Sequence, residues 1–208
     1  MQAKKNLKTY ERLSRLRDIV LSAAAVLLLW PFFLLISLLI VLDSPGAGPI
    51  FCQTRAGLNG KPFTIYKFRS MVPDAEQQLA ALLPCNDMDG PAFKIRCDPR
   101  ITRFGRFLRR SGLDELPQLW NVLRGDMSLV GPRPALLWEV ANYDERMRQR
   151  LTVLPGITCY WQIQPNRNGM PFQQWLALDL CYIRERNLRT DWRIIFKTFS
   201  AMGGMNGE

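Results

Sequence analysis

The feature that most constrains this chain is a long apolar segment near its N-terminus that contains no charged residue. It extends from Ile19 to Leu42, between Asp18 and Asp43, and is 24 residues long. A straight helix of that length would measure about 36 Å at about 1.5 Å per residue, and the hydrocarbon core of a bilayer is about 30 Å thick. Helices of water-soluble domains rarely have such a composition, so the sequence predicts a membrane segment.

Two observations favour a segment that enters and leaves through the same leaflet. Pro31 lies near the middle and would kink a helix, which leaves arms of 12 and 11 residues, each about 17 to 18 Å long and about one leaflet deep. Basic residues flank both ends, and the positive-inside rule draws both to the cytosol. They are Lys4, Lys5, Lys8, Arg12, Arg15 and Arg17 before the segment, and Arg55, Lys61, Lys67 and Arg69 after it. We therefore predict a re-entrant helix-break-helix. A single span is the alternative, and a signal peptide is disfavoured because the segment is long and no small-residue cleavage site follows.

Composition limits both the partners and the chemistry. The chain has 28 Lys and Arg against 18 Asp and Glu, a formal net charge of +10, which implies an anionic partner. It has no histidine, which excludes Ser-His triads and histidine-ligated zinc. Its five cysteines are widely spread without a C-x-x-C pair, so we expect neither disulfides nor zinc, and a reducing, cytosolic setting.

The length of 208 residues allows one catalytic domain with a membrane element. We assign residues 1–43 to a basic segment with the membrane element, and residues 44–208 to a cytosolic, membrane-associated domain. Its expected fold class is α+β and mostly helical, with a small hairpin and amphipathic interfacial helices around a single core. The expected hairpin strands are Ile50 to Arg55 and Phe63 to Phe68 around Asn59-Gly60, and the expected helices are Asp74 to Leu83, Ile101 to Arg110, Phe172 to Arg186 and Trp192 to Phe199.

Two adjacent carboxylates, Asp114 and Glu115, precede a short apolar helix that Gly125 is expected to end. Pro117 falls in its first turn, where a missing N–H costs little. The start of a helix favours negative charge, so it suits an ionised carboxylate or a substrate phosphate. Asp114 could also merely cap the helix, which is a common role of Asp at such a position.

A stiff loop follows, in which Arg133 stands between Pro132 and Pro134. A guanidinium group held in this way can offer a planar pair of donors to phosphate oxygens at little further cost in entropy. The doublet and the loop together are typical of a site that handles phosphate.

These motifs resemble the bacterial sugar transferases, the monotopic polyprenyl-phosphate phosphoglycosyl transferases, which move a sugar 1-phosphate from a nucleotide sugar to a lipid phosphate. The resemblance covers nearly the whole chain. Beyond the apolar segment, it rests on DSPGAGPIFCQTRAGLNGKPFTIYKFRSM, NDMDGPAFKIRCDPRITRFGRFLRRSGLDELPQLWNVLRGDMSLVGPRP, PGITCYWQ, LDLCYI and DWRIIFKTF.

The resemblance implies that Asp114 is the nucleophile and forms an aspartyl-phosphosugar intermediate, which the lipid phosphate then attacks. Glu115 would assist through magnesium or proton handling, and the adjacent carboxylates suit Mg²⁺ bridged to substrate phosphates. The candidate substrate-binding residues are Arg109 and Arg133, then Lys67 and Arg69, and finally Gln162 and Asp179.

The implied partners are a UDP-sugar, with glucose or galactose expected, undecaprenyl phosphate and the lipid bilayer, without nucleic acid; a homodimer is left open. The implied location is the cytoplasmic face of the bacterial inner membrane, and the implied role is the start of exopolysaccharide or O-antigen synthesis.

Two other hypotheses remain open. The lipid phosphate could attack the donor directly in a ternary complex, with Asp114 only a metal ligand. The chain could instead be a non-catalytic, membrane-tethered module whose basic face binds nucleic acid or acidic lipid, although such a module has no need for DELPQLW or GPRP.

Overall fold

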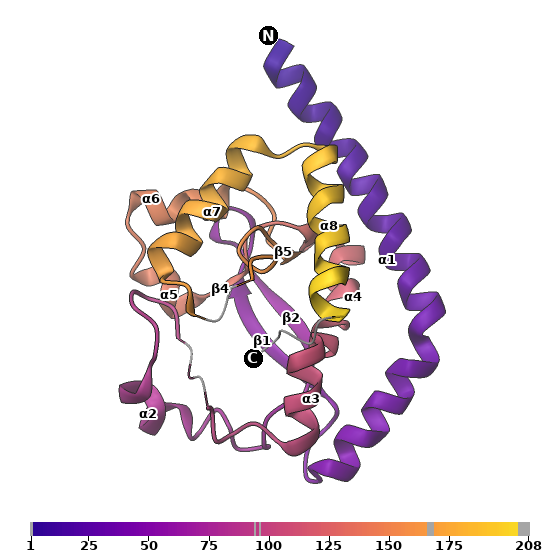
Figure 1. Cartoon of the computed structure of the whole chain (residues 1–208), viewed down its shortest axis with the longest axis vertical. Coiled ribbons are helices and arrows are strands. Elements are labelled where there is room, and N and C mark those ends of the chain that lie inside the picture. The colour runs from indigo at the N-terminus through magenta and orange to yellow at the C-terminus, as the bar shows by residue number, and fades with distance from the viewer. Residues whose placement is uncertain (1, 94, 96, 166–168, 204–208) are drawn as a thin grey trace.

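One long helix, α1 (Gln2–Asp43), runs along the side of a mixed α and β core in the computed structural model (Figure 1). The structure describes residues 2–93, 95, 97–165 and 169–203. Helical structure continues through Pro31, and α1 follows a bowed path. Proline bends a helix when the flanking turns remain stable. The predicted break is therefore not confirmed, whereas the long apolar helix is, and it is long and apolar enough to cross a membrane.

A hairpin forms the centre of the small sheet, as the Asn59-Gly60 turn predicts. Strands β1 (Ile50–Ala56) and β2 (Pro62–Phe68) pair in antiparallel register, and Asn59 has a φ of 55° in the turn. β4 (Ala135–Leu136) pairs with the other edge of β1, so β2 is an edge strand. β3 (Ser128–Val130) and β5 (Gly156–Thr158) form a separate parallel pair.

Two short helices carry the acidic doublet between them. α3 (Arg103–Ser111) begins after Thr102, whose side chain caps it, and ends at Gly112, which has a φ of 72°. The left-handed region costs glycine little, so Gly112 can turn the chain directly into a 3₁₀ turn, Leu113–Glu115. α4 (Gln118–Arg124) follows this turn and ends at Gly125, as predicted.

The C-terminal half of the chain places helices on both sides of the hairpin, and the last helix packs beside α1 (Figure 1). α7 (Phe172–Glu185) brings Trp175 against Trp161, with the ring centroids 4.1 Å apart. α8 (Leu188–Gly203) buries Ile194 and exposes Phe196, so this helix has both a core face and an exposed aromatic face. The remaining helices are α2 (Leu79–Leu82), α5 (Leu137–Ala141) and α6 (Glu145–Arg148), together with 3₁₀ turns at Leu83–Cys85 and Gln149–Thr152.

Most of the predicted helices and strands are present, but several begin or end at other residues than predicted. α3 begins two residues later than predicted because Thr102 is its cap, and α8 begins earlier, at Leu188. The helix predicted for Asp74 to Leu83 is wrong in its first half, since only Leu79–Leu82 is α-helical and turns precede it. The mostly helical α+β class with a small sheet is confirmed.

Buried charges attach the N-terminal half of α1 to the rest of the chain. Arg17 forms ion pairs of 2.6 Å with both Asp18 and Asp191, and all three side chains are buried. Tyr10 donates to Asp191 at 3.0 Å, and Ser128 donates to Asp18 at 2.6 Å. Because an unpaired buried charge is costly, these contacts fix α1 against α8 and β3.

The second half of α1 combines one packed face with a wide exposed surface. Ile36 and Ile40 are buried in an apolar cluster with Phe68 of β2 and Leu108 of α3. Most other apolar side chains between Val20 and Leu42 are exposed, and Leu28 is 76% exposed. An exposed apolar surface of this extent is typical of contact with lipid or with another protein.

Asn121 joins α4 to the free edge of β2. Its side-chain amide accepts from the backbone N–H of Tyr66 at 3.1 Å and donates to the carbonyl of Thr64 at 2.7 Å. Asn121 is completely buried. The Asn121 side chain thus forms the hydrogen bonds that a neighbouring strand would form with β2. It also fixes α4 relative to Lys67, which directly follows Tyr66 on β2.

Replacing Asn121 by leucine is expected to lower the free energy of unfolding by about 2 to 4 kcal/mol, because two buried backbone groups of β2 lose their partners. Thermal or denaturant unfolding of the solubilised protein measures this effect. Asn142→Leu, at an exposed position, is the matched control and should change little. Equal effects of the two substitutions would contradict the role of Asn121.

Candidate functional site

The acidic doublet lies in the tight turn between α3 and α4. The flanking Leu113 and Leu116 pack against the apolar cluster that joins α1, β2 and α3. Asp114 is 8% exposed, and the Glu115 side chain is 21% exposed. The N-cap of α4 is Pro117, which forms no side-chain cap. Capping of α4 therefore does not account for the position of Asp114.

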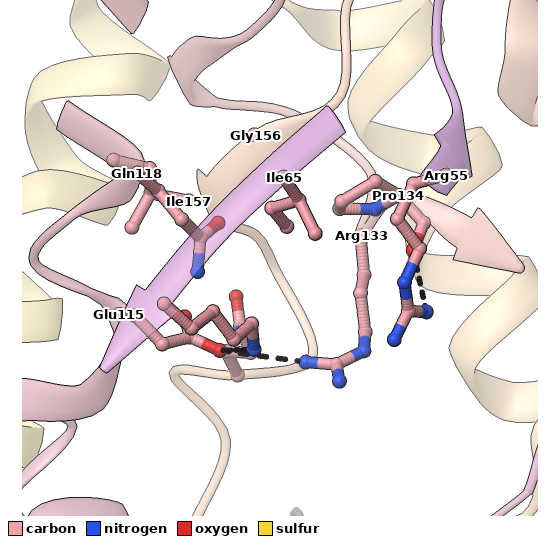
Figure 2. Close-up of a pocket in the computed structure, with 10 residues that line it drawn as sticks. Arg55, Ile65, Glu115, Gln118, Arg133, Pro134, Gly156 and Ile157 are labelled. Atoms are coloured by element: carbon pink, nitrogen blue, oxygen red, sulfur yellow. Dashed lines mark hydrogen bonds and ion pairs between the residues drawn. The ribbon is translucent and has the colours of Figure 1, made fainter. Parts of the chain in front are cut away.

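Two cations from distant parts of the chain meet at one oxygen of Glu115. Lys67 of β2 lies 2.9 Å from Glu115 Oε1, and Arg133, in the loop between β3 and β4, lies 3.6 Å from the same oxygen. Figure 2 shows the Arg133 side chain extending toward Glu115. The doublet, the hairpin and the proline-flanked loop therefore converge on one site.

The two adjacent carboxyl groups have opposite pKa shifts. Burial raises the pKa of Asp114 to about 6, against the lowering effect of Lys67, and the charge of Glu115 adds to the rise. Arg109 and Arg133 also favour the ionised form of Asp114. For Glu115, burial acts to raise the pKa, but Lys67 and Arg133 outweigh it and the pKa is lowered. Glu115 is thus the permanent anion, and Asp114 titrates close to neutral pH.

A small, electropositive pocket opens beside Glu115. Its wall contains three cations, Arg55, Lys67 and Arg133, against the single carboxylate of Glu115. The other lining residues are Ile65, Gln118, Pro134, Gly156, Ile157 and Gln162. Three cations beside one carboxylate favour the binding of an anionic group, such as a phosphate.

Close packing of two backbones holds the loop that carries Arg133. The Gly156 N–H donates to the carbonyl of Pro132 at 3.0 Å. A Cβ on Gly156 would lie 2.0 Å from the backbone nitrogen of Gly131, which no side chain could tolerate. Arg150 donates to the carbonyl of Arg133 at 3.3 Å from the other side. The backbone at Arg133 is therefore held on one side by the backbone of Gly156 and on the other by the side chain of Arg150.

The structure brings some predicted site residues together and places others elsewhere. Lys67, Arg133 and Gln162 line the pocket with Glu115, whereas Asp114 is adjacent to the pocket but outside its lining. Gln162 also accepts from the Cys159 thiol at 3.3 Å. The structure thus gathers Lys67, Arg133 and Gln162 around Glu115 more than around Asp114.

Three other candidates lie outside the pocket lining. Arg69 is buried and donates to the carbonyls of Ser44, Ala47 and Gly48, so it shapes the turn after α1. Arg109 donates to Ser70 Oγ at 2.9 Å and acts on Asp114 through its charge.

Asp179 lies in the interior. It is 0% exposed and accepts from Arg150 at 2.8 Å, and Arg150 in turn supports the backbone of Arg133. Its hydrogen bond is to a neighbouring arginine, which links it to the backbone of the loop that carries Arg133.

Arg55 and Gln118 were missed as site residues by the sequence analysis. The sequence does contain a pattern that indicates the first of them. Alternation along the two strands puts Arg55, Ile65 and Lys67 on the same face of the hairpin, given the register set by the Asn-Gly turn. Burial and the Arg133 cation lower the pKa of Arg55 to about 10, which leaves it charged at neutral pH. Nothing in the local sequence of Gln118 indicates that it lines a pocket.

The donor set allows one mode of metal binding. Within the described part of the chain, no group of three or more Cys, Asp or Glu side chains lies together. Glu115 uses one oxygen, Oε1, for both of its cations, and Asp114 is its neighbour in sequence. Magnesium commonly takes one or two carboxylates and completes its coordination with substrate phosphates and water, so this pair fits Mg²⁺ in the presence of a phosphate ligand.

Comparison with known proteins shows that nearly the whole chain matches the model of one protein family. The model described as bacterial sugar transferase matches residues 9–204. The chain is 46% identical to the galactosyl transferase CpsE of Streptococcus agalactiae over 76% of this chain and 35% of that protein. It is 42% identical to the undecaprenyl-phosphate glucose phosphotransferase of Komagataeibacter xylinus over 87% of this chain and 34% of that protein.

A third relative matches over most of both chains. The exopolysaccharide production protein PSS of Rhizobium leguminosarum bv. phaseoli is 42% identical over 89% of this chain and 92% of its own length. The chain thus spans only about a third of the Streptococcus and Komagataeibacter proteins, but almost all of the Rhizobium protein.

In magnesium-free protein, Lys67→Met is expected to raise the pKa of Asp114 above its value of about 6, because the lysine charge favours the ionised carboxylate. Asp114 is neutral below its pKa and charged above it, so the transition should move to higher pH. Carbon-13 NMR of labelled aspartate carboxyl groups measures the shift, and Asp114→Asn identifies the resonance. Lys61→Met, at an exposed hairpin position, is the control. An unchanged or lowered pKa in Lys67→Met would contradict this view of the site.

Proposed function

The chain belongs to the bacterial sugar transferase family, and from that premise we propose that it transfers a sugar 1-phosphate from a UDP-sugar to undecaprenyl phosphate, which gives undecaprenyl-diphosphate-sugar and UMP. The observation that carries the proposal is the doublet itself, a pair of carboxyl groups with opposed pKa shifts beside a pocket lined by three cations. Relatives named as undecaprenyl-phosphate glucose and galactose phosphotransferases support the reaction class.

The proposed first step is attack of an ionised Asp114 oxygen on the phosphorus atom that carries the sugar. The new bond joins the Asp114 carboxylate oxygen to that phosphorus, and the bond between it and the bridging oxygen breaks, so UMP leaves with the electron pair. A pKa of about 6 leaves Asp114 mainly ionised at neutral pH, yet poorly solvated and therefore reactive.

In the proposed second step, an oxygen of the lipid phosphate attacks the same phosphorus and the bond to Asp114 breaks, which regenerates the carboxylate. Both steps bring anionic oxygens together, so neutralisation of charge is the main requirement. Arg55, Lys67 and Arg133 supply positive charge to the pocket. Magnesium held by Asp114 and Glu115 would neutralise further phosphate charge.

The membrane part of the proposal rests on the exposed surfaces of α1 and α3. α3 starts beside the end of α1, where Asp43 accepts from the backbone N–H of Phe104 at 3.0 Å. Its exposed side chains combine Phe107 with the three cations Arg103, Arg106 and Arg110. A basic amphipathic helix next to an apolar one suits the water-lipid boundary. We propose that α1 is re-entrant, bent at Pro31, and that the domain lies on the cytoplasmic face of the inner membrane.

The proposals for the sugar and the pathway come from the names of the relatives. The names of the relatives divide between glucose and galactose, and several are exopolysaccharide production proteins. We propose glucose or galactose as the sugar and the start of exopolysaccharide or O-antigen synthesis as the role. We also propose that the chain has no nucleic-acid partner, and homodimer formation is a further option.

Purified protein given UDP-glucose or UDP-galactose, undecaprenyl phosphate and magnesium is expected to release UMP. Chelation by EDTA should abolish this release, and added Mg²⁺ should restore it. Asp114→Asn should lower kcat by at least about a thousandfold, since it removes the nucleophile, and Glu115→Gln should also impair turnover. Mass spectrometry should find a sugar-phosphate adduct on wild-type protein incubated without the lipid acceptor. Asp126→Asn, next to Gly125 and outside the pocket lining, is the control.

The same assay separates the alternatives. Parallel double-reciprocal plots support the covalent route, and intersecting plots support direct transfer in a ternary complex. Failure to release UMP from any common UDP-sugar would refute the proposed function, and salt-sensitive DNA binding without UMP release would favour a non-catalytic module.

Cysteines introduced at Lys8 and Lys61, which are exposed on either side of the apolar segment, are expected to label from the same side of the membrane. The background replaces the exposed cysteines Cys52, Cys85 and Cys97 by serine. An impermeant maleimide should label both positions in inside-out vesicles and neither in intact spheroplasts. Labelling from opposite sides would show that α1 spans the membrane.

A further inference from the structure

Two buried hydrogen-bond donors in the wall of the pocket lack a partner. They are Nε2 of Gln118 and Nε of Arg55, and no described residue accepts from either atom. Gln118 is 2% exposed, so its amide is almost completely withdrawn from bulk water. Most buried polar side-chain atoms in folded proteins are hydrogen-bonded, and an exception calls for an explanation.

A second buried amide on the same helix has a structural role and provides a comparison for Gln118. Asn121 lies three residues after Gln118 on α4, and both side chains are buried. Asn121 uses its amide oxygen and nitrogen on the backbone of β2. Gln118 instead projects its amide into the pocket, on the side where Glu115 lies (Figure 2). The fold therefore satisfies Asn121 internally and leaves the nitrogen of Gln118 directed into the pocket without a partner.

The surroundings of that nitrogen specify the ligand chemistry. The missing partner must accept a hydrogen bond, and the pocket wall presents Arg55, Lys67 and Arg133, which favour an anion. Glu115, the carboxylate of the wall, already accepts a hydrogen bond from Lys67 and forms an ion pair with Arg133. A phosphoryl oxygen is an anionic acceptor, so it suits a pocket with three cations and two unpartnered donors. Gln118 follows Asp114 by only four residues, so an acceptor bound to Gln118 would lie close to the doublet.

We propose that Gln118 is a substrate-binding residue, and that its side-chain N–H donates to a phosphoryl oxygen held in this pocket, with Arg55 Nε as a second donor. The proposal rests on the proposed function for the identity of that phosphate, which belongs either to the diphosphate of the UDP-sugar or to the lipid phosphate. Before the ligand binds, the unpaired amide destabilises the protein, and the ligand relieves this cost.

The test compares Gln118→Met with wild-type protein. The methionine has a similar volume and no donor, so removal of the unpartnered amide should raise the Tm of the ligand-free protein by about 2 to 4 °C. Affinity for inorganic diphosphate and for UDP, measured by isothermal titration on detergent-solubilised full-length protein, should fall by about 10- to 100-fold, as expected for loss of a hydrogen bond to a charged group. KM should rise with little change in kcat, because the contact exists before the transition state.

Two further variants sharpen the comparison. Gln118→Glu keeps the shape but replaces the donor by a carboxylate, so it should weaken diphosphate binding more than Gln118→Met does, and it serves as the reporter if the methionine variant does not fold. Gln174→Met makes the same chemical change in the exposed first turn of α7, outside the pocket lining, and should alter neither Tm nor affinity appreciably.

The outcomes show whether the phosphate belongs to the UDP-sugar or to the lipid. They also test the role of Gln118 separately from the proposed reaction. A rise in KM for the UDP-sugar assigns the contact to the donor, and a rise confined to undecaprenyl phosphate assigns it to the lipid. Unchanged affinity for diphosphate, UDP and lipid phosphate in both Gln118 variants overturns the inference, whatever happens to Tm. If wild-type protein releases no UMP but Gln118→Met still weakens diphosphate binding, the phosphate contact stands and the proposed reaction is wrong.

Discussion

The arrangement of the site depends on one side-chain amide, that of Asn121. By bonding the backbone edge of β2, it fixes α4 in a single register against the strand that carries Lys67. The turn with Glu115 immediately precedes α4, so the same contact sets how closely Lys67 approaches Glu115. A buried amide enforces this register strongly, because any slip would leave backbone groups of an edge strand unpaired away from water.

In that register, the buried cations and carboxylates determine the pKa values of the two acidic side chains. Two carboxyl groups adjacent in sequence cannot both be stabilised equally, and the cations favour Glu115, whose pKa is lowered while that of Asp114 rises to about 6. One carboxylate thus remains an anchor for Lys67 and Arg133, and the other stays poorly solvated. The unpartnered amide of Gln118 lies in the wall of the same pocket, and the anion that we propose there would give it a partner.

Elements defined by local sequence were predictable. The apolar helix, the hairpin around Asn59-Gly60 and the end of α4 at Gly125 follow from runs of a few residues whose conformational preferences are strong. The course of α1 through Pro31 was harder to predict, because whether a proline bends or breaks a helix depends on what the flanking turns contact. The helix predicted from Asp74 was too long, since periodicity alone did not reveal the turns that precede α2.

The sequence by itself determined which chemical groups are present: a long apolar helix, an acidic doublet, a proline-flanked arginine and no histidine. Only the tertiary structure decided which of them meet. It drew Arg55 and Gln118 into the pocket and placed Asp179 in the interior beside Arg150. The physical reason is that burial, pKa and hydrogen-bond satisfaction depend on segments far apart in the chain, and local sequence does not record how closely those segments approach.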